Sequence, residues 1–282
     1  AISGISALAL IEQSIKNSKK IGIVNKEALV SAGKFIIKLA NKNNTKIFPL
    51  DSEHYSIYNY LLNSNLDNLI NIKKIYLTAS GGPFLYNKLN SLKNVTLQQA
   101  LKHPTWKMGL KNTIDSSTMI NKCLEIIEAH YLFNLSYEKL DIIIHPESLI
   151  HSIINTKDGS LNLNMSNNDM SIPIFSFLSN NIENPYNNLD ICKIDKLRFV
   201  KPNKNQFPSL RIFEQLNKKS LSELIIFNTS NEYAVNLFVK NKIKYHEITN
   251  YIEKSLNKFE KRNIYNIKDV ILYQKYLYDK LY

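Results

Sequence analysis

The stretch "KIGIVNKEALVSAGKFIIKLANKNNTKIFPL", residues 20–50, decides the fold class. Short apolar runs at 20–24 and 46–50 predict strands, and the segment 25–42 between them has the periodicity of a helix. Because a helix between two consecutive strands favours parallel pairing, this unit indicates an α/β protein with a mostly parallel sheet.

The rest of the chain extends this pattern. Further strands are predicted at 74–79 and 141–145, and further helices at 7–16 and 117–133. The helix 117–133 is apolar on much of its circumference, so we expect it to be partly buried. From Ser209 to the end the pattern is helical.

Composition limits the classes of function. The 282 residues contain 36 Lys and Arg against 24 Asp and Glu, a net charge of +12. The excess is mostly lysine scattered among Asn, Ile and Tyr, without an Arg-rich strip, so we expect no nucleic-acid partner. No apolar run is long enough for a membrane span, and the first residues lack a signal-peptide pattern. We therefore expect no membrane partner.

The two cysteines, Cys123 and Cys192, form neither a disulfide framework nor a metal-binding spacing, which indicates a reducing compartment. We expect Cys192 to be a small buried residue.

Asp51 and Glu53 directly follow the predicted strand 46–50. On an extended segment these two side chains would point to the same side, at the strand end where α/β proteins bind ligands. Adjacent carboxylates repel each other unless a cation lies between them, so the pair indicates a divalent metal. Taken alone, the stretch also fits a solvated turn.

Two further stretches carry polar groups that could bind a phosphate or another anion. Residues 78–84, "TASGGPF", offer Ser80 and two glycines after a strand, where the backbone can approach an anion closely. In "IDSSTMINKCLE", residues 114–125, Asn121 and Glu125 share one helical face, with Lys122 beside them and Ser116 near the expected helix start.

The stretch "HPTWKMG", residues 103–109, holds the only tryptophan and has the composition of a closing lid. A buried tryptophan anchor is the alternative interpretation.

Several motifs occur together in one order, and they cover residues 1 to about 250. They are "NKEALVSAG", "LDSEH", "SGGPF", "LKHPTWKMG", "IDSSTMINKCLEIIEAHYLF", "IIIHPESLIHS", "NDMSIPI" and "FNTSNEYAVNLF". In this order and spacing the sequence resembles the 1-deoxy-D-xylulose 5-phosphate reductoisomerase family. The resemblance implies a C-terminal remnant of a Rossmann-like NADPH domain at 1–50 and an α/β catalytic domain at 51–180. The stretch at 181–206 is rich in Asn and Pro, which is typical of a linker, and a separate helical domain is expected at 207–282.

The resemblance also implies roles for individual residues. Asp51, Glu53 and Glu125 would hold Mg²⁺ or Mn²⁺. The substrate phosphate would contact Ser80, Ser116, Asn121 and Lys122. The sugar chain would contact Lys26, Ser52 and His103. NADPH would contact Asn25, Glu27 and Gly109, and Trp106 and Met108 would belong to the lid over the substrate. Asp51, Glu53, Glu125, Lys26 and His103 would form the catalytic group.

The implied reaction converts 1-deoxy-D-xylulose 5-phosphate to 2-C-methyl-D-erythritol 4-phosphate, by a rearrangement that resembles retro-aldol cleavage and recombination, followed by hydride transfer from NADPH. The resemblance further implies a homodimer. Because no transit peptide is in view, we expect the bacterial cytoplasm, with the plastid stroma as an alternative location. A relative that binds metal and sugar phosphate without catalysis is the alternative function.

The sequence departs from the family pattern in several places. No G-x-G-x-x-G motif can be drawn from its seven glycines, so we expect the N-terminal part of the NADPH domain to be missing. Cys123 stands where the family usually has glycine and could crowd the substrate, and Asn168 replaces a usual proline. His145 and His151 are more typical of hydrogen-bonded structural residues than of ligands.

Overall fold

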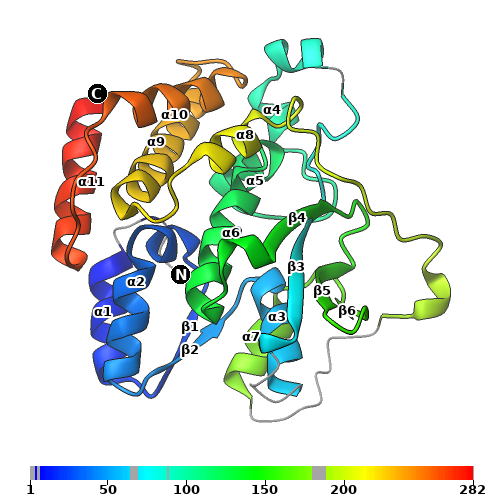
Figure 1. Ribbon diagram of the computed structural model, residues 1–282. Helices are drawn as coiled ribbons and strands as arrows, with labels where there is room; N and C mark the ends of the chain where they lie inside the picture. The colour runs from blue at the N-terminus through cyan, green and yellow to red at the C-terminus, as the bar shows by residue number, and fades with distance from the viewer. Residues whose placement is uncertain (1–3, 5–6, 64–68, 88, 180–188, 282) are drawn as a thin grey trace.

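The computed structural model of the protein describes residue 4 and residues 7–63, 69–87, 89–179 and 189–281 (Figure 1). The helices are α1 (Leu8–Asn17), α2 (Lys26–Lys42), α3 (Ser52–Asn63), α4 (Leu97–Ala100), α5 (Leu110–Ser117), α6 (Ile120–Phe133), α7 (Ser171–Leu178), α8 (Pro208–Gln215), α9 (Leu221–Val239), α10 (Glu247–Lys258) and α11 (Ile267–Leu281). The strands are β1 (Lys20–Ile23), β2 (Lys46–Pro49), β3 (Ile72–Ala79), β4 (Leu140–Ile144), β5 (Ile150–Thr156) and β6 (Leu161–Met165).

The predicted strand–helix–strand unit is confirmed. β1 and β2 pair in parallel, from Lys20 opposite Lys46 to Ile23 opposite Pro49, and α2 connects them. Asn25 caps α2, because its side chain accepts a hydrogen bond from the backbone N–H of Ala28. This unit brings the N-terminus of α2 to the end of β1, where the site lies.

The larger sheet corrects one expectation. Its strand order is β4-β3-β5-β6, and of its pairings only β3 with β4 is parallel among the described residues. The α/β class is confirmed, but this sheet is mixed rather than mostly parallel. β5 pairs antiparallel with β3, and a hairpin makes β6 antiparallel to β5. This hairpin turns at Gly159 with a φ of +91°, while the Asp158 carboxylate accepts from the N–H of Ser160.

The long helix predicted at 117–133 is interrupted near its start. α5 ends at Ser117 and α6 begins at Ile120, because Met119 between them adopts a left-handed conformation with a φ of +63°. Ser116 therefore lies in the last turn of α5, and the expectation that it lies near a helix start is wrong. α6 is buried along most of its length and packs against α2, α5 and α8, which makes it the central helix of the fold.

The predicted C-terminal helices are confirmed as α8 to α11, with α9, α10 and α11 lying side by side (Figure 1). α9 also packs against α2, and Ile225 and Ile226 of α9 share an apolar cluster with Ala32 of α2 and Val270 of α11. α9 and α11, which are far from α2 in the sequence, therefore pack against α2, the helix whose N-terminal residue Lys26 lines the cavity described below.

Part of the predicted linker 181–206 falls on residues 181–188, outside the described residues. Beyond them, Val200 exchanges two backbone hydrogen bonds of 2.8 Å with Ile144 at the end of β4. Cys192 is exposed, so the expectation that it is buried is wrong. No helix among the described residues is long and apolar enough to cross a membrane.

Candidate functional site

One cavity of about 270 Å³ gathers all the residues that the sequence assigned to catalysis and substrate binding. They are Lys26, Asp51, Ser52, Glu53, Ser80, His103, Trp106, Met108, Ser116, Asn121, Lys122 and Glu125. They come from α2, α3 and the residue before it, α5, α6, the residue after β3 and the segment between α4 and α5. Segments that are distant in the sequence therefore line the same cavity. This agrees with the predicted grouping, although the role of each residue stays a proposal.

Three carboxylates form the acidic centre of this cavity. Asp51, Glu53 and Glu125 can each offer an oxygen atom within 4.8 Å of the other two. The expectation that Asp51 and Glu53 lie on an extended segment is wrong, because α3 begins at Ser52 and places Glu53 in its first turn. Asp51 and Glu53 still come close together, as we predicted, but the first turn of a helix and not an extended segment places them there.

Two lysines balance part of this negative charge. Lys26 Nζ lies 2.9 Å from Asp51 Oδ2 and 3.1 Å from Glu125 Oε1. Lys122 Nζ lies 2.5 Å from both Glu53 Oε1 and Glu125 Oε2. Three carboxylates against two ammonium groups leave one negative charge unbalanced within this set.

The pKa values of two of these acids shift in opposite directions. Burial, followed by the charge of Glu125, raises the pKa of Glu53 to about 7, although Lys122 acts in the opposite direction. Burial also acts to raise the pKa of Asp51, but Lys26 and then His54 outweigh it and hold that pKa well below its usual range. A divalent cation at this centre would supply the missing positive charge, so these residues fit such an ion.

Asn121 and Glu125 lie on one face of α6, as predicted. The Asn121 amide donates a hydrogen bond to Glu125 Oε1, and Lys26 donates to Asn121 Oδ1 over 2.8 Å. The cavity wall formed by α6 is therefore a connected polar surface rather than a row of independent side chains.

His103 presents a neutral donor to the cavity. The backbone N–H groups of Thr105 and Trp106 donate to its Nδ1 over 3.2 and 2.9 Å, so the ring proton resides on Nε2. Nε2 lies 3.1 Å from both Ser80 Oγ and Ser116 Oγ. Burial, and then the charge of Lys122, lowers the pKa of His103 to about 4. Two hydroxyls and one N–H therefore meet at one point, which suits an oxyanion.

The glycines after Ser80 allow tight packing of their loop, while the expected approach of their backbone to an anion stays a prediction. Gly81 and Gly82 adopt φ values of +83° and +66°. A Cβ on Gly82 would lie 2.9 Å from the backbone Cα of Ser117, so this glycine allows the loop to approach the end of α5. The close approach in the structure is to the protein's own backbone.

The residues assigned to NADPH do not line the cavity among the described residues. Asn25 caps α2, and its amide also donates to the carbonyl of Gly4 over 2.9 Å. Glu27 pairs with Lys111 over 3.0 Å. Gly109 is exposed at the start of α5. These assignments stay predictions from the family resemblance.

The predicted lid lies between α4 and α5 without regular secondary structure. Trp106 is partly exposed and lines the cavity, and its ring centre lies 6.2 Å from that of His151. The half-buried tryptophan thus forms part of the cavity wall, while its closing motion remains a prediction.

The departures from the family pattern lie at different distances from the cavity. Cys123 is fully buried in the apolar core and does not line the cavity, so it does not crowd a ligand there. Met170, two residues after Asn168, does line it. His145 is structural as predicted, because its Nδ1 donates to the carbonyl of Arg198 over 2.9 Å and its Nε2 accepts from the N–H of Leu149.

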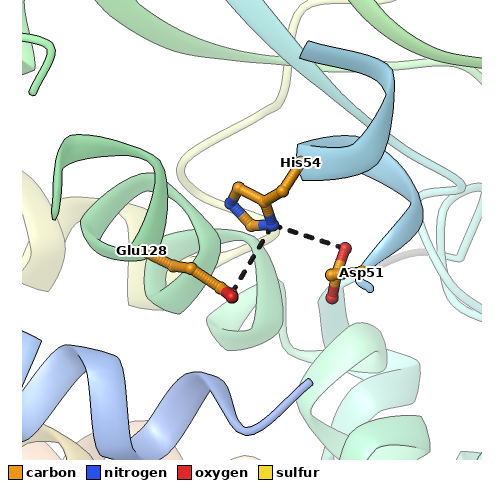
Figure 2. Close-up of side chains that lie close together, drawn as sticks. All are labelled: Asp51, His54 and Glu128. Atoms are coloured by element: carbon orange, nitrogen blue, oxygen red, sulfur yellow. Dashed lines mark ion pairs between the residues drawn. The ribbon is translucent and has the colours of Figure 1, made fainter. Parts of the chain in front are cut away.

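Sequence reasoning missed three residues of this region. His151 makes the structural hydrogen bond that we predicted, with the carbonyl of Ser166 over 3.3 Å, but it also lines the cavity. His54 and Glu128 are completely buried behind Asp51, and Figure 2 shows the three side chains pointing toward one another. The available signal was spacing, because His54 follows Asp51 by three residues and Glu128 follows Glu125 by three on a helix.

Two family models match the chain. The model of the 1-deoxy-D-xylulose 5-phosphate reductoisomerase C-terminal domain matches residues 47–133, and the model of the DXP reductoisomerase C-terminal domain matches residues 165–277. Among curated proteins, the 1-deoxy-D-xylulose 5-phosphate reductoisomerase of Clostridium novyi (strain NT) is 42% identical over 273 residues, which cover 96% of this chain and 70% of the relative. The enzyme of the same name from Wolbachia pipientis wMel is 41% identical over 276 residues, with the same two coverages.

Solved structures give the same result. A crystal structure of DOX-P reductoisomerase in complex with NADPH, fosmidomycin and magnesium matches with a TM-score of 0.91 and 32% identity. The 1-deoxy-D-xylulose 5-phosphate reductoisomerase from Zymomonas mobilis in complex with NADPH matches with a TM-score of 0.88 and 33% identity. Each match covers 100% of this chain and 73% of the solved chain.

Proposed function

Because the chain belongs to the 1-deoxy-D-xylulose 5-phosphate reductoisomerase family, we propose that its cavity serves the metal- and NADPH-dependent conversion of 1-deoxy-D-xylulose 5-phosphate to 2-C-methyl-D-erythritol 4-phosphate. The observation that carries the proposal is the convergence of Asp51, Glu53 and Glu125 with Lys26 and Lys122 on one cavity. These side chains come from α2, α3 and α6 and, for Asp51, from the residue directly before α3.

Asp51, Glu53 and Glu125 would hold Mg²⁺ or Mn²⁺, since both ions prefer oxygen ligands. The excess of one negative charge over the two lysines supports this assignment, and burial together with the charge of Glu125 raises the pKa of Glu53. When bound, the cation supplies Lewis-acid stabilisation of developing oxyanion charge, worth several kcal/mol.

The other side of the cavity would bind the sugar phosphate. Ser80, Ser116, Asn121 and Lys122 would hold the phosphate, with the neutral Nε2–H of His103 as a further donor. Lys26 and Ser52 would orient the sugar chain beside the carboxylates, because both line the cavity next to them. Two anchored ends would hold the substrate in one orientation.

NADPH supplies the hydride when bound, as it does in the family. Asn25, Glu27 and Gly109 are the residues of this chain that we propose to contact it, on the resemblance alone. Trp106 and Met108 would cover the bound substrate and exclude water from it.

Other family features stay proposals for this chain. We propose a homodimer in a bacterial cytoplasm, and the domain boundaries at 1–50, 51–180, 181–206 and 207–282. The packing of α2 against both α6 and α9 means that these parts would be mechanically connected.

The test is steady-state turnover of 1-deoxy-D-xylulose 5-phosphate with NADPH and Mn²⁺. We expect Glu125→Gln to lower kcat at least ~10²-fold, about 2.7 kcal/mol of barrier, because metal ligation weakens. Glu138→Gln, at an exposed position outside the cavity, is the matched control and should keep wild-type turnover. Unchanged turnover in Glu125→Gln would contradict the assignment. Metal-dependent binding without turnover in the wild type would favour the non-catalytic relative.

A further inference from the structure

A buried ion pair joins α5 to α2 on the outer side of the cavity wall. Lys111 Nζ, in the first turn of α5, lies 3.0 Å from Glu27 Oε1, in the first turn of α2. The Lys111 side chain is 20% exposed and the Glu27 side chain 6%. Neither residue lines the cavity as the described part of the chain forms it, so the pair does not itself contact a ligand there.

The two helices carry residues from opposite ends of the proposed site. Glu27 directly follows Lys26, whose Nζ lies 2.9 Å from Asp51 Oδ2 at the acidic centre. Lys111 shares α5 with Ser116, whose Oγ lies 3.1 Å from His103 Nε2. α2 therefore contributes to the metal end and α5 to the phosphate end. Both helices pack against α6 and α9, and the ion pair links them to each other directly.

α5 also begins where the predicted lid ends. Thr113 Oγ1 donates a hydrogen bond to the carbonyl of Gly109 over 3.0 Å, which fixes the first turn of the helix. Met108, the residue before Gly109, lines the cavity. A displacement of α5 would therefore move the end of the lid together with Ser116.

A second carboxylate holds Lys111 in place. Asp115 Oδ2, one turn further along α5, lies 2.5 Å from Lys111 Nζ, and Asp115 Oδ1 accepts a hydrogen bond from the Asn231 amide of α9 over 2.9 Å. Asp115 and Asn231 are completely buried. Burial acts to raise the pKa of Glu27, but the charge of Lys111 outweighs it and lowers that pKa, so the pair is charged at neutral pH. This network fixes α5 against both α2 and α9.

Such a pair defines a separation more than it adds stability. The Coulomb energy of a buried ion pair is largely offset by the water that both charges lose. A ligand that binds at two ends, however, gains its affinity only when both ends of the site are correctly spaced and aligned. The distance between α2 and α5 is thus a quantity to which binding of a metal-chelating sugar phosphate is sensitive.

We propose that Lys111 is a positioning residue, which acts through Glu27 to set the separation between the metal end and the phosphate end of the cavity. The inference rests on the proposed function and deepens it. Loss of the pair weakens a ligand that spans both ends. A ligand that occupies one end, Mg²⁺ at the carboxylates or inorganic phosphate at the other end, does not depend on their separation and keeps its affinity.

The test uses variants of the two carboxylates beside Lys111. Glu27→Ala removes the link to α2. Asp115→Asn is the matched control, because it removes the other charge but keeps the Lys111–Glu27 pair and an oxygen that can accept from Asn231. Each variant leaves Lys111 one carboxylate partner, so neither creates an unpaired buried charge. Glu27→Gln keeps an acceptor for Lys111 and tests for partial rescue.

Titration calorimetry measures the Kd of Mg²⁺ alone and the Kd of 1-deoxy-D-xylulose 5-phosphate at saturating Mg²⁺. The Kd of inorganic phosphate is measured by its competition with the sugar phosphate. NADPH is left out, so that the proposed contact of Glu27 with this cofactor does not affect the result. Urea titration of each variant measures its free energy of unfolding separately.

We expect Glu27→Ala to raise the Kd of the sugar phosphate about tenfold, with the values for Mg²⁺ and inorganic phosphate within about twofold of the wild type. Glu27→Gln should recover part of the loss, and Asp115→Asn should stay within about twofold for all three ligands. Wild-type affinity of both Glu27 variants for the sugar phosphate would overturn the inference and make the pair purely structural. An equal loss for inorganic phosphate, or an equal loss in Asp115→Asn, would also overturn it. Sugar-phosphate binding by the wild type that needs no Mg²⁺, or that phosphate does not compete with, would overturn the proposed function and the inference with it.

Discussion

The ammonium group of Lys26, in the first turn of α2, lies 3.1 Å from the carboxylate of Glu125 in the middle of α6. These residues are 99 positions apart in the sequence, and both side chains are almost completely buried. Removing one member of such a pair leaves a buried charge without its partner. The contact therefore ties the N-terminal strand–helix–strand unit to the acidic centre, and the cavity depends on both parts of the chain.

Lys122→Ala should mainly weaken binding of the sugar phosphate. We expect KM to rise about tenfold or more, ~1.4 kcal/mol, with a much smaller change in kcat, because a phosphate contact serves ground and transition states alike. Steady-state kinetics at saturating Mn²⁺ measures both constants. Lys193→Ala, at an exposed position, is the control. An unchanged KM would remove Lys122 from the phosphate site.

Gly82→Ala should destabilise the loop that carries Ser80. Gly82 and Gly159 both have positive φ values, but only at Gly82 would a Cβ meet backbone, 2.9 Å away at Ser117. We expect Gly159→Ala to cost about 1 kcal/mol and Gly82→Ala at least ~1 kcal/mol more in the free energy of unfolding. Urea titration measures both. Equal losses would mean that the loop accommodates the methyl group.

The neutral state of His151 should make the protein sensitive to acid. Burial lowers the pKa of His151 to about 4. The unfolded chain binds a proton at this residue below about pH 6.5, whereas the native chain does so only below about pH 4, so stability falls as the pH drops through that window. The contribution is about 2 kcal/mol at pH 5.

His151→Gln should remove this part of the pH dependence. We expect the free energy of unfolding to fall less between about pH 7.5 and pH 5 in the variant than in the wild type, as measured by urea titration at each pH. An identical pH dependence in both proteins would show that His151 takes up its proton equally in the native and unfolded chains.

Local sequence patterns predicted much of the fold and the grouping of the site. The apolar runs around 20–24 and 46–50 fixed two strands, because strand periodicity depends on neighbouring residues only. The spacing of Asn121 and Glu125 placed them on one helical face for the same reason. That Asn121 and Glu125 share a site with Ser80 and His103 was predicted from the family resemblance and not from spacing.

The errors arose where longer-range contacts or single backbone conformations decide the structure. The break at Met119 depends on one left-handed residue, which moved Ser116 from a helix start to a helix end. The dipeptide Asp158-Gly159 is typical of a hairpin turn, and it joins the two antiparallel strands β5 and β6. Spacing places His54 near Asp51 and Glu128 near Glu125, but the contact between His54 and Glu128 joins two helices, and spacing within one helix does not predict it.

The central claim is that the three carboxylates hold the cation to which the sugar phosphate binds. Calorimetric titration of 1-deoxy-D-xylulose 5-phosphate into the protein, with and without Mn²⁺, tests it most directly, with Glu125→Gln alongside. We predict binding that requires both Mn²⁺ and Glu125. Binding of equal strength without Mn²⁺, or in Glu125→Gln, would contradict the claim.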